Sequence, residues 1–390
     1  MLEHLGWTDL LRRWSGEAIE HADAVDLQVT PEMFASDWIG GPPASAADIA
    51  AAEARLGRSL PQSYQAFLAL TDGWPVLSFD FGRVRPVAEL DWFAAADPGL
   101  YEMVCDRHGD EWPPDGDDGP PLMNRALLLS TGTDNFLYDT GRLGPDGEWA
   151  TRRWTSWMPG GDDVRPSFRA GLESHYASFV RFEAAESVTR SEVAAQVEDA
   201  YQRALRGDRG GRGVVFEAQD FGSARAEVLE PQFSVLTNQY RAAIGFCNLA
   251  GGEQAEDPAM LADLWPMFVV AAADPGDQQQ WALDQAIHNS GGSVAGLLRS
   301  LAAQCARDGG LVAGFAYAPA FAAAMDGVRE LVRAGRDDEA FEAVLGALPS
   351  WRPLSPLHLA PMGLVWDRDL GRIMTRERCE RVLDTARGSG

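Results

Sequence analysis

The sequence predicts an α+β domain followed by an all-α helical domain, in a chain of 390 residues that is long enough for two domains. Apolar residues first recur at helical spacing, then alternate in short runs between residues 76 and 154, and then return to helical spacing up to residue 180. After residue 213 the spacing is helical throughout, and alanine and leucine replace the earlier tryptophan, proline and aspartate. We therefore predict a first domain over residues 1–188, a helix and linker over 189–213, and a helical domain over 214–390.

Two short helices are expected near the start of the first domain. Ser45 and Asp48 stand at the spacing of a capping box, in which the serine side chain accepts a backbone N–H of the first turn. Gly57 can adopt the left-handed conformation that ends such a helix. Pro61 suits the first turn of a second helix, which we expect to end at Gly73.

A small antiparallel sheet and a closing helix complete the predicted first domain. Apolar residues alternate in short runs at residues 76–81, 126–130, 135–138 and 149–154. Turns are expected at residues 140–141 and at Asp146-Gly147, because a tight hairpin turn requires positive φ angles. Ser167 is expected to cap a final helix with Phe168 and Phe179 on its buried face.

Repeated spacings of three and four residues mark the predicted helical domain. Helices are expected at residues 193–205, 229–244, 281–288, 294–305, 321–332, 341–348 and 375–386. Gly335 and Asp337 supply the stop and start of a short connection between two antiparallel helices. No repeat period is clear, so an irregular bundle is favoured over tetratricopeptide-like repeats. The arginine- and glycine-rich stretch at residues 206–213 is interpreted as a linker.

The chain is strongly acidic, and this charge excludes some partners. It has 33 basic residues, all arginine, and 58 acidic residues, for a formal net charge of −25. Residues 1–188 hold 31 acidic and 14 basic residues, so 14 − 31 = −17 of that charge lies in the first domain. Such a field repels phosphate backbones and anionic lipid, so we expect neither nucleic acid nor a membrane as a partner.

A cytoplasmic location is expected. The first 13 residues lack the basic and apolar regions of a secretory signal. The longest apolar stretch, residues 264–273, has about half of the roughly 20 residues that span a bilayer. The four cysteines, Cys105, Cys247, Cys305 and Cys379, show no CxxC spacing and are interpreted as reduced thiols.

Signatures of catalysis and of cofactor binding are missing from the sequence. The six histidines show no metal-ligand spacing, and no G-x-S-x-G or G-x-G-x-x-G motif precedes a predicted helix. Because the chain has no lysine, a Walker site and a Schiff-base mechanism are excluded. We therefore expect a protein that is not an enzyme and that uses neither a cofactor nor a metal.

Several motifs in the first domain occur together in one known superfamily. They are the Glu-x-Arg-Leu-Gly turn at residues 53–57, the Leu-Pro-x-x-Tyr-x-x-Phe-Leu helix at residues 60–68, the Asp72-Gly73 pair, a strand over residues 132–139 that closes on Asp139, and the Ser167-Phe168 helix. Residues 36–185 thereby resemble the SUKH superfamily, which includes fungal Smi/Knr-type cell-wall regulators and bacterial toxin-immunity proteins. Residues 1–35 are expected to be an N-terminal extension of this domain. The resemblance implies a binding domain without a shared catalytic site. Most motif positions themselves are interpreted as structural.

The candidate partner-binding residues are acidic and aromatic. Six carboxylates crowd residues 106–118. The full set is Asp110, Glu111, Asp115, Asp117, Asp118, Asp162, Asp163, Trp154 and Trp157. Acidic loops mimic phosphates and attract a basic partner such as a nuclease toxin, and tryptophan is common in binding hot spots. A merely solvated loop, a divalent-metal site and, for the tryptophans, a place in the sheet core remain as alternatives.

The leading hypothesis is a protein that binds and neutralises a basic toxin, that is, an immunity protein. The alternative is a regulatory scaffold of the cell-wall-regulator type that binds cellular proteins. A third hypothesis is an enzyme that uses Asp115, Asp117 and Asp118 with a divalent ion.

Overall fold

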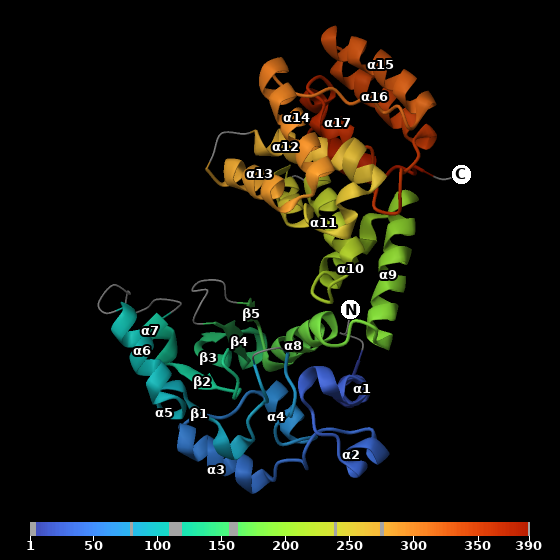
Figure 1. Ribbon diagram of the computed structural model, residues 1–390. Helices are drawn as coiled ribbons and strands as arrows, with labels where there is room; N and C mark the ends of the chain where they lie inside the picture. Colours follow the sequence, from blue (N-terminus) through green and yellow to red (C-terminus); the bar gives the residue numbers. More distant parts are fainter. Residues whose placement is uncertain are drawn as a thin grey trace. The chain divides into compact units, whose positions relative to one another are not determined.

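The computed structural model describes residues 5–78, 81–108, 119–155, 163–237, 240–273 and 277–388 (Figure 1). The chain divides into two compact units. The first contains Met1–Ser191 and Asp220–Gly222, and the second contains Glu192–Gln219 and Ser223–Gly390. Buried apolar side chains occur in both, so each unit has a core of its own.

Over its described residues, the first unit is an α+β fold around a five-stranded antiparallel sheet, as predicted. The strands lie side by side in chain order: β1 (Asp91–Trp92), β2 (Ala126–Leu128), β3 (Asn135–Leu143), β4 (Trp149–Trp154) and β5 (Asp163–Arg165). The hairpin between β3 and β4 turns at Asp146 and Gly147, whose φ angles are 60° and 77°. This confirms the turn that the Asp-Gly pair predicts.

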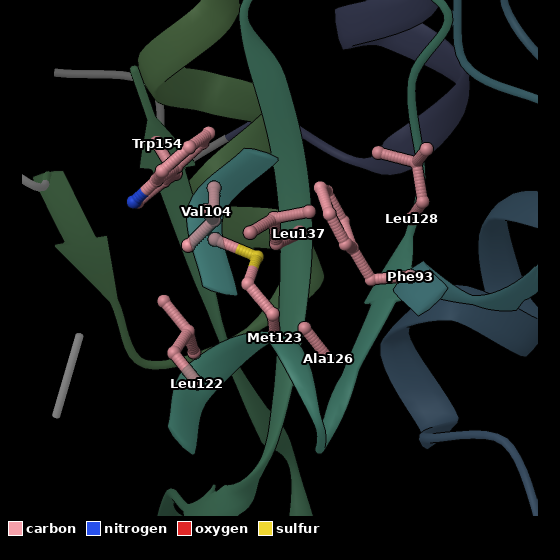
Figure 2. Packing of buried hydrophobic residues seen from close by; sticks show 8 residues of the cluster. All are labelled: Phe93, Val104, Leu122, Met123, Ala126, Leu128, Leu137 and Trp154. Atoms are coloured by element: carbon pink, nitrogen blue, oxygen red, sulfur yellow. The ribbon is translucent and has the colours of Figure 1, made fainter. Parts of the chain in front are cut away.

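Both faces of the sheet are covered, because neighbouring residues of a strand point to opposite sides. Leu137 of β3 packs with residues of α5 (Phe93–Ala96), α6 (Pro98–His108) and α7 (Gly119–Met123) (Figure 2). On the other face Phe136 and Tyr138 contact Phe168, the first residue of α8 (Phe168–Phe182), with ring centroids 5.9 and 6.0 Å apart. The sheet is therefore the middle layer of the unit.

The predicted helix starts and stops are confirmed in α3 (Ala46–Leu56) and α8. Ser45 Oγ accepts the N–H of Asp48 at 3.1 Å, and Gly57 ends α3 with a φ of 68°. Ser167 Oγ accepts the N–H of Ala170 at 3.2 Å at the start of α8. The next helix, α4 (Gln62–Leu68), follows Pro61 as expected but ends at Leu68, before the predicted end at Gly73.

The prediction of a strand over residues 76–81 is wrong for the residues described there. The N–H of Leu77 donates to the carbonyl of Gly82 at 2.8 Å, which closes a turn. The flanking residues Trp74 and Val84 form an isolated bridge, and Val84 forms another with Ser130. Val76, Leu77 and Phe81 are all buried, so the described residues of this run lack the alternation of a half-buried strand.

The prediction of a turn at residues 140–141 is also wrong. Thr140 and Gly141 continue β3, and the pairing with β4 shifts between Asp139 and Leu143. The glycine therefore accompanies a bulge, at which the N–H of Gly141 donates to Asp139 Oδ1 at 3.1 Å.

Helix α1 (Trp7–Glu20) was not predicted, since residues 1–35 were expected only as an extension. Its Trp14 is fully buried, and the Trp14 ring lies 5.2 Å from Tyr176 and 5.9 Å from Phe179, both on α8. The Tyr176 hydroxyl donates to Glu17 Oε2 at 2.7 Å. Helix α1 of the extension is thus part of the core of the first unit. The short helix α2 (Pro31–Ser36) follows α1 in the chain.

Over its described residues the second unit is helical, as predicted, apart from one isolated bridge. Helix α9 (Val188–Leu205) begins in the first unit and continues into the second. The following α-helices are α10 (Arg212–Ala218), α11 (Ala224–Leu236), α12 (Trp265–Ala272), α13 (Asp277–Asn289), α14 (Gly292–Asp308), α15 (Pro319–Arg333), α16 (Asp337–Ala347), α17 (Gly363–Trp366) and α18 (Arg376–Leu383). Among the described helices, none has both the length and the apolar character to cross a membrane.

Two details of the helical unit bear on its predictions. The expected helix over residues 229–244 is divided, because α11 ends at Leu236 and residues Tyr240–Leu249 form a 3-10 helix. The short connection between α15 and α16 is confirmed, with Gly335 at a φ of 72°. Local spacing thus located most of these helices, but it missed α10, α12 and α17 and the interruption after Leu236.

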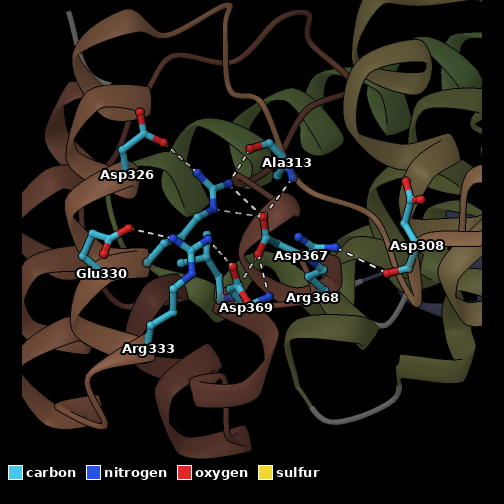
Figure 3. A network of polar contacts seen from close by, with 10 residues as sticks. Asp308, Ala313, Asp326, Glu330, Arg333, Asp367, Arg368 and Asp369 are labelled. Atoms are coloured by element: carbon cyan, nitrogen blue, oxygen red, sulfur yellow. Dashed lines mark hydrogen bonds and ion pairs between the residues drawn. The ribbon is translucent and has the colours of Figure 1, made fainter.

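The core of the second unit contains paired polar groups. Asp263 Oδ2 lies 2.9 Å from His358 Nε2, and its Oδ1 accepts the indole N–H of Trp366 at 2.8 Å. Arg329 and Asp367, both buried, form an ion pair of 2.8 Å. Figure 3 shows the network of polar contacts around Asp367. Because each buried charge has partners, these groups fix the packing of distant helices without leaving an isolated charge inside.

All four cysteines are free thiols, as expected. Cys105 is half-buried on α6, and Cys247, Cys305 and Cys379 are buried. Burial raises the pKa of each of these three thiols, to about 12 for Cys379. They are therefore protonated and unreactive at neutral pH.

Candidate functional site

Most of the candidate partner-binding residues belong to two segments outside the described residues. Asp110, Glu111, Asp115, Asp117 and Asp118 lie in the first segment, between α6 and α7. Trp157 and Asp162 lie in the second segment, between β4 and β5. The structure describes the residues on either side of both segments, and these residues define where each segment starts and ends.

One hydrophobic cluster holds the elements from which both segments start. Val104 of α6, Leu122 of α7 and Trp154 of β4 all belong to it, and the Phe93 ring lies 6.4 Å from that of Trp154 (Figure 2). Val104 lies shortly before the first segment, Leu122 shortly after it, and Trp154 shortly before the second. The described elements that flank the two segments therefore share a common patch of core.

Trp154 itself is part of that core. Only 4% of its surface is exposed, which agrees with the alternative that the tryptophans of β4 face the sheet core. Its large side chain buries apolar area where β4 ends. Its described role is thus structural.

Asp163, the one described acidic candidate, is brought together with an arginine. Asp163 Oδ1 pairs with Arg165 Nε at 2.6 Å, and its Oδ2 accepts the hydroxyl of Ser174 at 2.7 Å. Arg165 also approaches Asp220 at 3.4 Å. Burial lowers the pKa of Arg165, but Asp163 and Asp220 raise it more, so it lies above its ordinary value. Sequence reasoning missed this cluster because Asp220 is far away in the chain.

Asp139, which closes the motif strand, serves the fold. Arg125 donates to its Oδ1 at 2.7 Å, and Arg152 pairs with its Oδ2 at 3.1 Å. Burial alone would raise the pKa of Asp139, but these two arginines lower it below its ordinary value. A charge held this firmly by its own domain is a poor contact for a partner.

The remaining polar motif residues satisfy backbone groups. Glu53 Oε1 accepts the N–H of Leu60 at 2.8 Å across the corner between α3 and α4. Asp72 Oδ1 accepts the N–H of Val87 at 2.6 Å. The apolar motif residues Leu56, Leu60, Tyr64, Phe67 and Leu68 are buried. These positions are structural, as the sequence analysis expects.

An open groove of about 490 Å³ lies on the first unit and was not predicted. Asp23, Asp26 and Glu183 line it together with Arg83, and Pro75 and Leu77 add apolar surface. Its walls come from four separate parts of the chain, so no local pattern in the sequence indicates it. Three carboxylates against one guanidinium favour a cationic side chain as its occupant.

One buried pair of the first unit has the residue types of a hydrolase. Ser78 Oγ lies 2.9 Å from His175 Nδ1, and both side chains are buried. Burial, followed by the charge of Arg153, lowers the pKa of His175 well below its ordinary value. Ser78 is among the residues that line the groove, but it is only 3% exposed and His175 is fully buried, so we interpret the pair as a structural contact. Among the described residues, no three His, Cys, Asp or Glu side chains are grouped to hold a metal ion.

Comparison with known proteins identifies the fold of the first unit. Residues 43–168 match the SMI1 / KNR4 family (SUKH-1). The match contains all five strands of the sheet together with α3 and α4, and it leaves out α1 and the helical unit. No curated protein and no solved structure matches the chain.

Proposed function

We propose, from the SUKH-superfamily domain that lies within the first unit, that this protein acts by binding a protein partner. More specifically, we propose that it is an immunity protein that binds and neutralises a basic toxin, without catalytic activity of its own. The family is consistent with an immunity role or with a Smi1/Knr4-type regulatory role. The negative charge of the first domain supports the immunity role, because it attracts a basic partner.

The observation that carries the proposal is an acidic segment whose two flanking helices belong to one hydrophobic cluster. Residues 110–118 contain five carboxylates and no basic residue. The helices on both sides of this segment, and the strand that leads to Trp157 and Asp162, share one hydrophobic cluster. Loops that a rigid core positions are the usual carriers of binding function. A net charge of −17 over residues 1–188 adds long-range attraction for a cationic partner.

The acidic groove supports the same proposal. Asp23, Asp26 and Glu183 offer a second place at which an arginine or lysine side chain of a partner docks. A basic toxin that contacts both the acidic segment and the groove would bind at two negatively charged places. The bound domain would then occlude the active site of the toxin.

The experiment is an affinity capture from the organism that produces the protein, with three forms of the full chain as bait. One form is the wild type. The second carries Asp110→Asn, Glu111→Gln, Asp115→Asn, Asp117→Asn and Asp118→Asn. The matched control neutralises five other exposed acids of the first unit, through Asp9→Asn, Glu20→Gln, Glu32→Gln, Asp146→Asn and Glu186→Gln. Both variants change the formal charge equally, from −25 to −25 + 5 = −20.

The expected result is a basic protein that the wild type and the control retain and that the segment variant loses. Coexpression should then show that the wild type suppresses the growth defect which the captured protein causes. Capture of envelope-synthesis or other cellular proteins, equally by all three forms, would instead support the regulatory scaffold. Heat in a calorimetric titration with Mg²⁺ or Ca²⁺ that the segment variant loses would support the metal-dependent enzyme.

A further inference from the structure

The arginine- and glycine-rich stretch at residues 206–213 is folded. It contains the 3-10 helix Arg209–Gly211 and leads directly into α10. Asp208 Oδ1 accepts the N–H of Gly210 at 2.8 Å, and its Oδ2 accepts the Nε–H of Arg203 at 2.8 Å. The stretch therefore has its own capping contacts, unlike the flexible linker that its composition predicts.

Two glycines of this stretch are required by close packing. Gly207 has a φ of 87°, and a Cβ at this position would meet the carbonyl oxygen of Asp384 at 2.7 Å. A Cβ at Gly211 would meet the Cβ of Ala200 at 2.7 Å. The backbone is thus pressed against neighbouring elements of the second unit, which fixes the directions in which the adjacent arginine side chains leave it.

Those arginines line an open groove of about 640 Å³ on the second unit. Arg209 and Arg212 lie on one side, and Arg376 and Glu380 of α18 lie on another. Phe233 and Leu383 supply apolar lining. Three guanidinium groups and one carboxylate leave an excess of positive charge, in a chain whose formal charge is −25.

The three arginines keep N–H donors available for a ligand, although two of them pair with Glu380. Arg376 Nε contacts Glu380 at 2.9 Å and Arg209 Nη1 contacts it at 3.2 Å, and these contacts lower the pKa of that carboxyl, so it is ionised at neutral pH. Arg209 Nε also pairs with Asp384 Oδ1 at 3.2 Å. The side chains of Arg209 and Arg376 are still 44% and 66% exposed. Arg212 uses one nitrogen, Nη2, to donate to Ser234 Oγ at 3.1 Å. A guanidinium group has five N–H donors, so each arginine can serve a ligand as well.

We propose that this groove binds the phosphate group of a small phosphorylated molecule. Guanidinium forks match phosphate oxygens, and three of them placed around one space suit a tetrahedral group better than a planar carboxylate. The apolar residues would contact the rest of the molecule. The groove is larger than a phosphate ion and falls within the ordinary size of a small-molecule site. The negative field of the whole chain opposes a nucleic acid, which carries many phosphates, more strongly than a small molecule that carries one or two.

The test is isothermal titration calorimetry of the full chain with inorganic phosphate and pyrophosphate, with citrate as the carboxylate probe, at constant ionic strength. We expect pyrophosphate to bind, and Arg212→Gln and Arg209→Gln each to weaken it by about tenfold or more, since each removes a charged hydrogen bond. The matched control is Arg299→Gln, which removes an exposed arginine of α14 outside the groove and should leave the affinity unchanged. Thermal melts of each variant show that it is folded.

Two results would overturn the inference. One is the lack of pyrophosphate binding to the wild type at millimolar concentration, and the other is equal binding by the wild type and both groove variants. Binding of citrate with the same dependence on Arg209 and Arg212, but no binding of pyrophosphate, would reassign the groove to carboxylates. The proposal concerns the helical unit alone, so its failure leaves the immunity proposal standing, and the converse also holds.

Discussion

At the scale of single residues, Asp139 is the charged group on which the first unit depends most. Its side chain is buried between Arg125 and Arg152. Asp139→Asn removes the negative charge and leaves two arginines without their carboxylate, which should lower the free energy of unfolding by about 3–5 kcal/mol. Urea denaturation followed by circular dichroism measures this loss. Asp146→Asn is the control, because Asn tolerates the positive φ of that exposed turn and should change stability by less than about 0.5 kcal/mol.

The pH dependence of the same variant gives a second readout. The folded pKa of Asp139 is lowered, so its ion pairs stabilise the fold above the unfolded pKa of about 3.9 and are lost as pH falls through the folded value. The stability of the wild type should therefore fall more steeply than that of Asp139→Asn below pH 4. Parallel curves would contradict the assignment of this carboxylate as ionised in the core.

His175 should produce a separate loss of stability at higher pH. Its pKa is lowered well below the ordinary value in the folded state, so the unfolded chain takes up a proton first as the pH falls below about 6.5. Between pH 6.5 and pH 5 the free energy of unfolding should fall by up to about 1.4 kcal/mol per pH unit. Denaturation midpoints measured across this range test the expectation. His175→Gln, which has no titrating ring, should lack this slope, and an unchanged slope in that variant would refute it.

At the scale of elements, α1 is one of the parts of the first unit that local patterns did not predict. Trp14 fills space among Trp74, Tyr176 and Phe179, which are all distant in sequence. Trp14→Ala should cost about 3–5 kcal/mol through lost burial and the cavity left behind. Denaturation of Phe34→Ala provides the comparison, because Phe34 on α2 is 75% exposed and its truncation should cost little. If both variants unfold alike, α1 is not part of the core.

Elements with strong local signals were predictable, and those that depend on tertiary contacts were not. Ser45, Gly57 and Ser167 act through the backbone of their own turns, so the sequence located α3 and α8 correctly. Gly141 could indicate a turn or a bulge from the sequence alone. Pairing with the neighbouring strand β4 and the hydrogen bond to Asp139 produce a bulge at this position.

The candidate sites also divide into one that the sequence reveals and others that depend on tertiary structure. The acidic segment was found because its carboxylates are consecutive, and the sequence alone defines its charge. The grooves could not be found, because the residues that line each of them come from separate segments. The stretch at residues 206–213 was interpreted from its composition as a linker, whereas close contacts at Gly207 and Gly211 give it a fixed shape.

At the scale of the whole molecule, charge should govern how fast a partner is found. With a formal charge of −25, association with a basic protein is steered electrostatically, and salt screens this attraction over a distance of about 10 Å at 0.1 M. Stopped-flow measurements with the captured partner should show an association rate constant that falls by about tenfold or more between about 0.01 M and 0.15 M salt. The segment variant should lose part of this dependence. A rate that salt does not change would point to an interface driven by apolar contact.

The distribution of thiols also makes the protein convenient to observe. Cys105 is half-buried on α6, shortly before the acidic segment, whereas the other three sulfur atoms are buried and protonated. A maleimide dye therefore has one preferred point of attachment in the native protein, with no cysteine to be introduced or removed. Because that point lies beside the proposed contact surface, the emission of the dye would report the arrival of a partner directly.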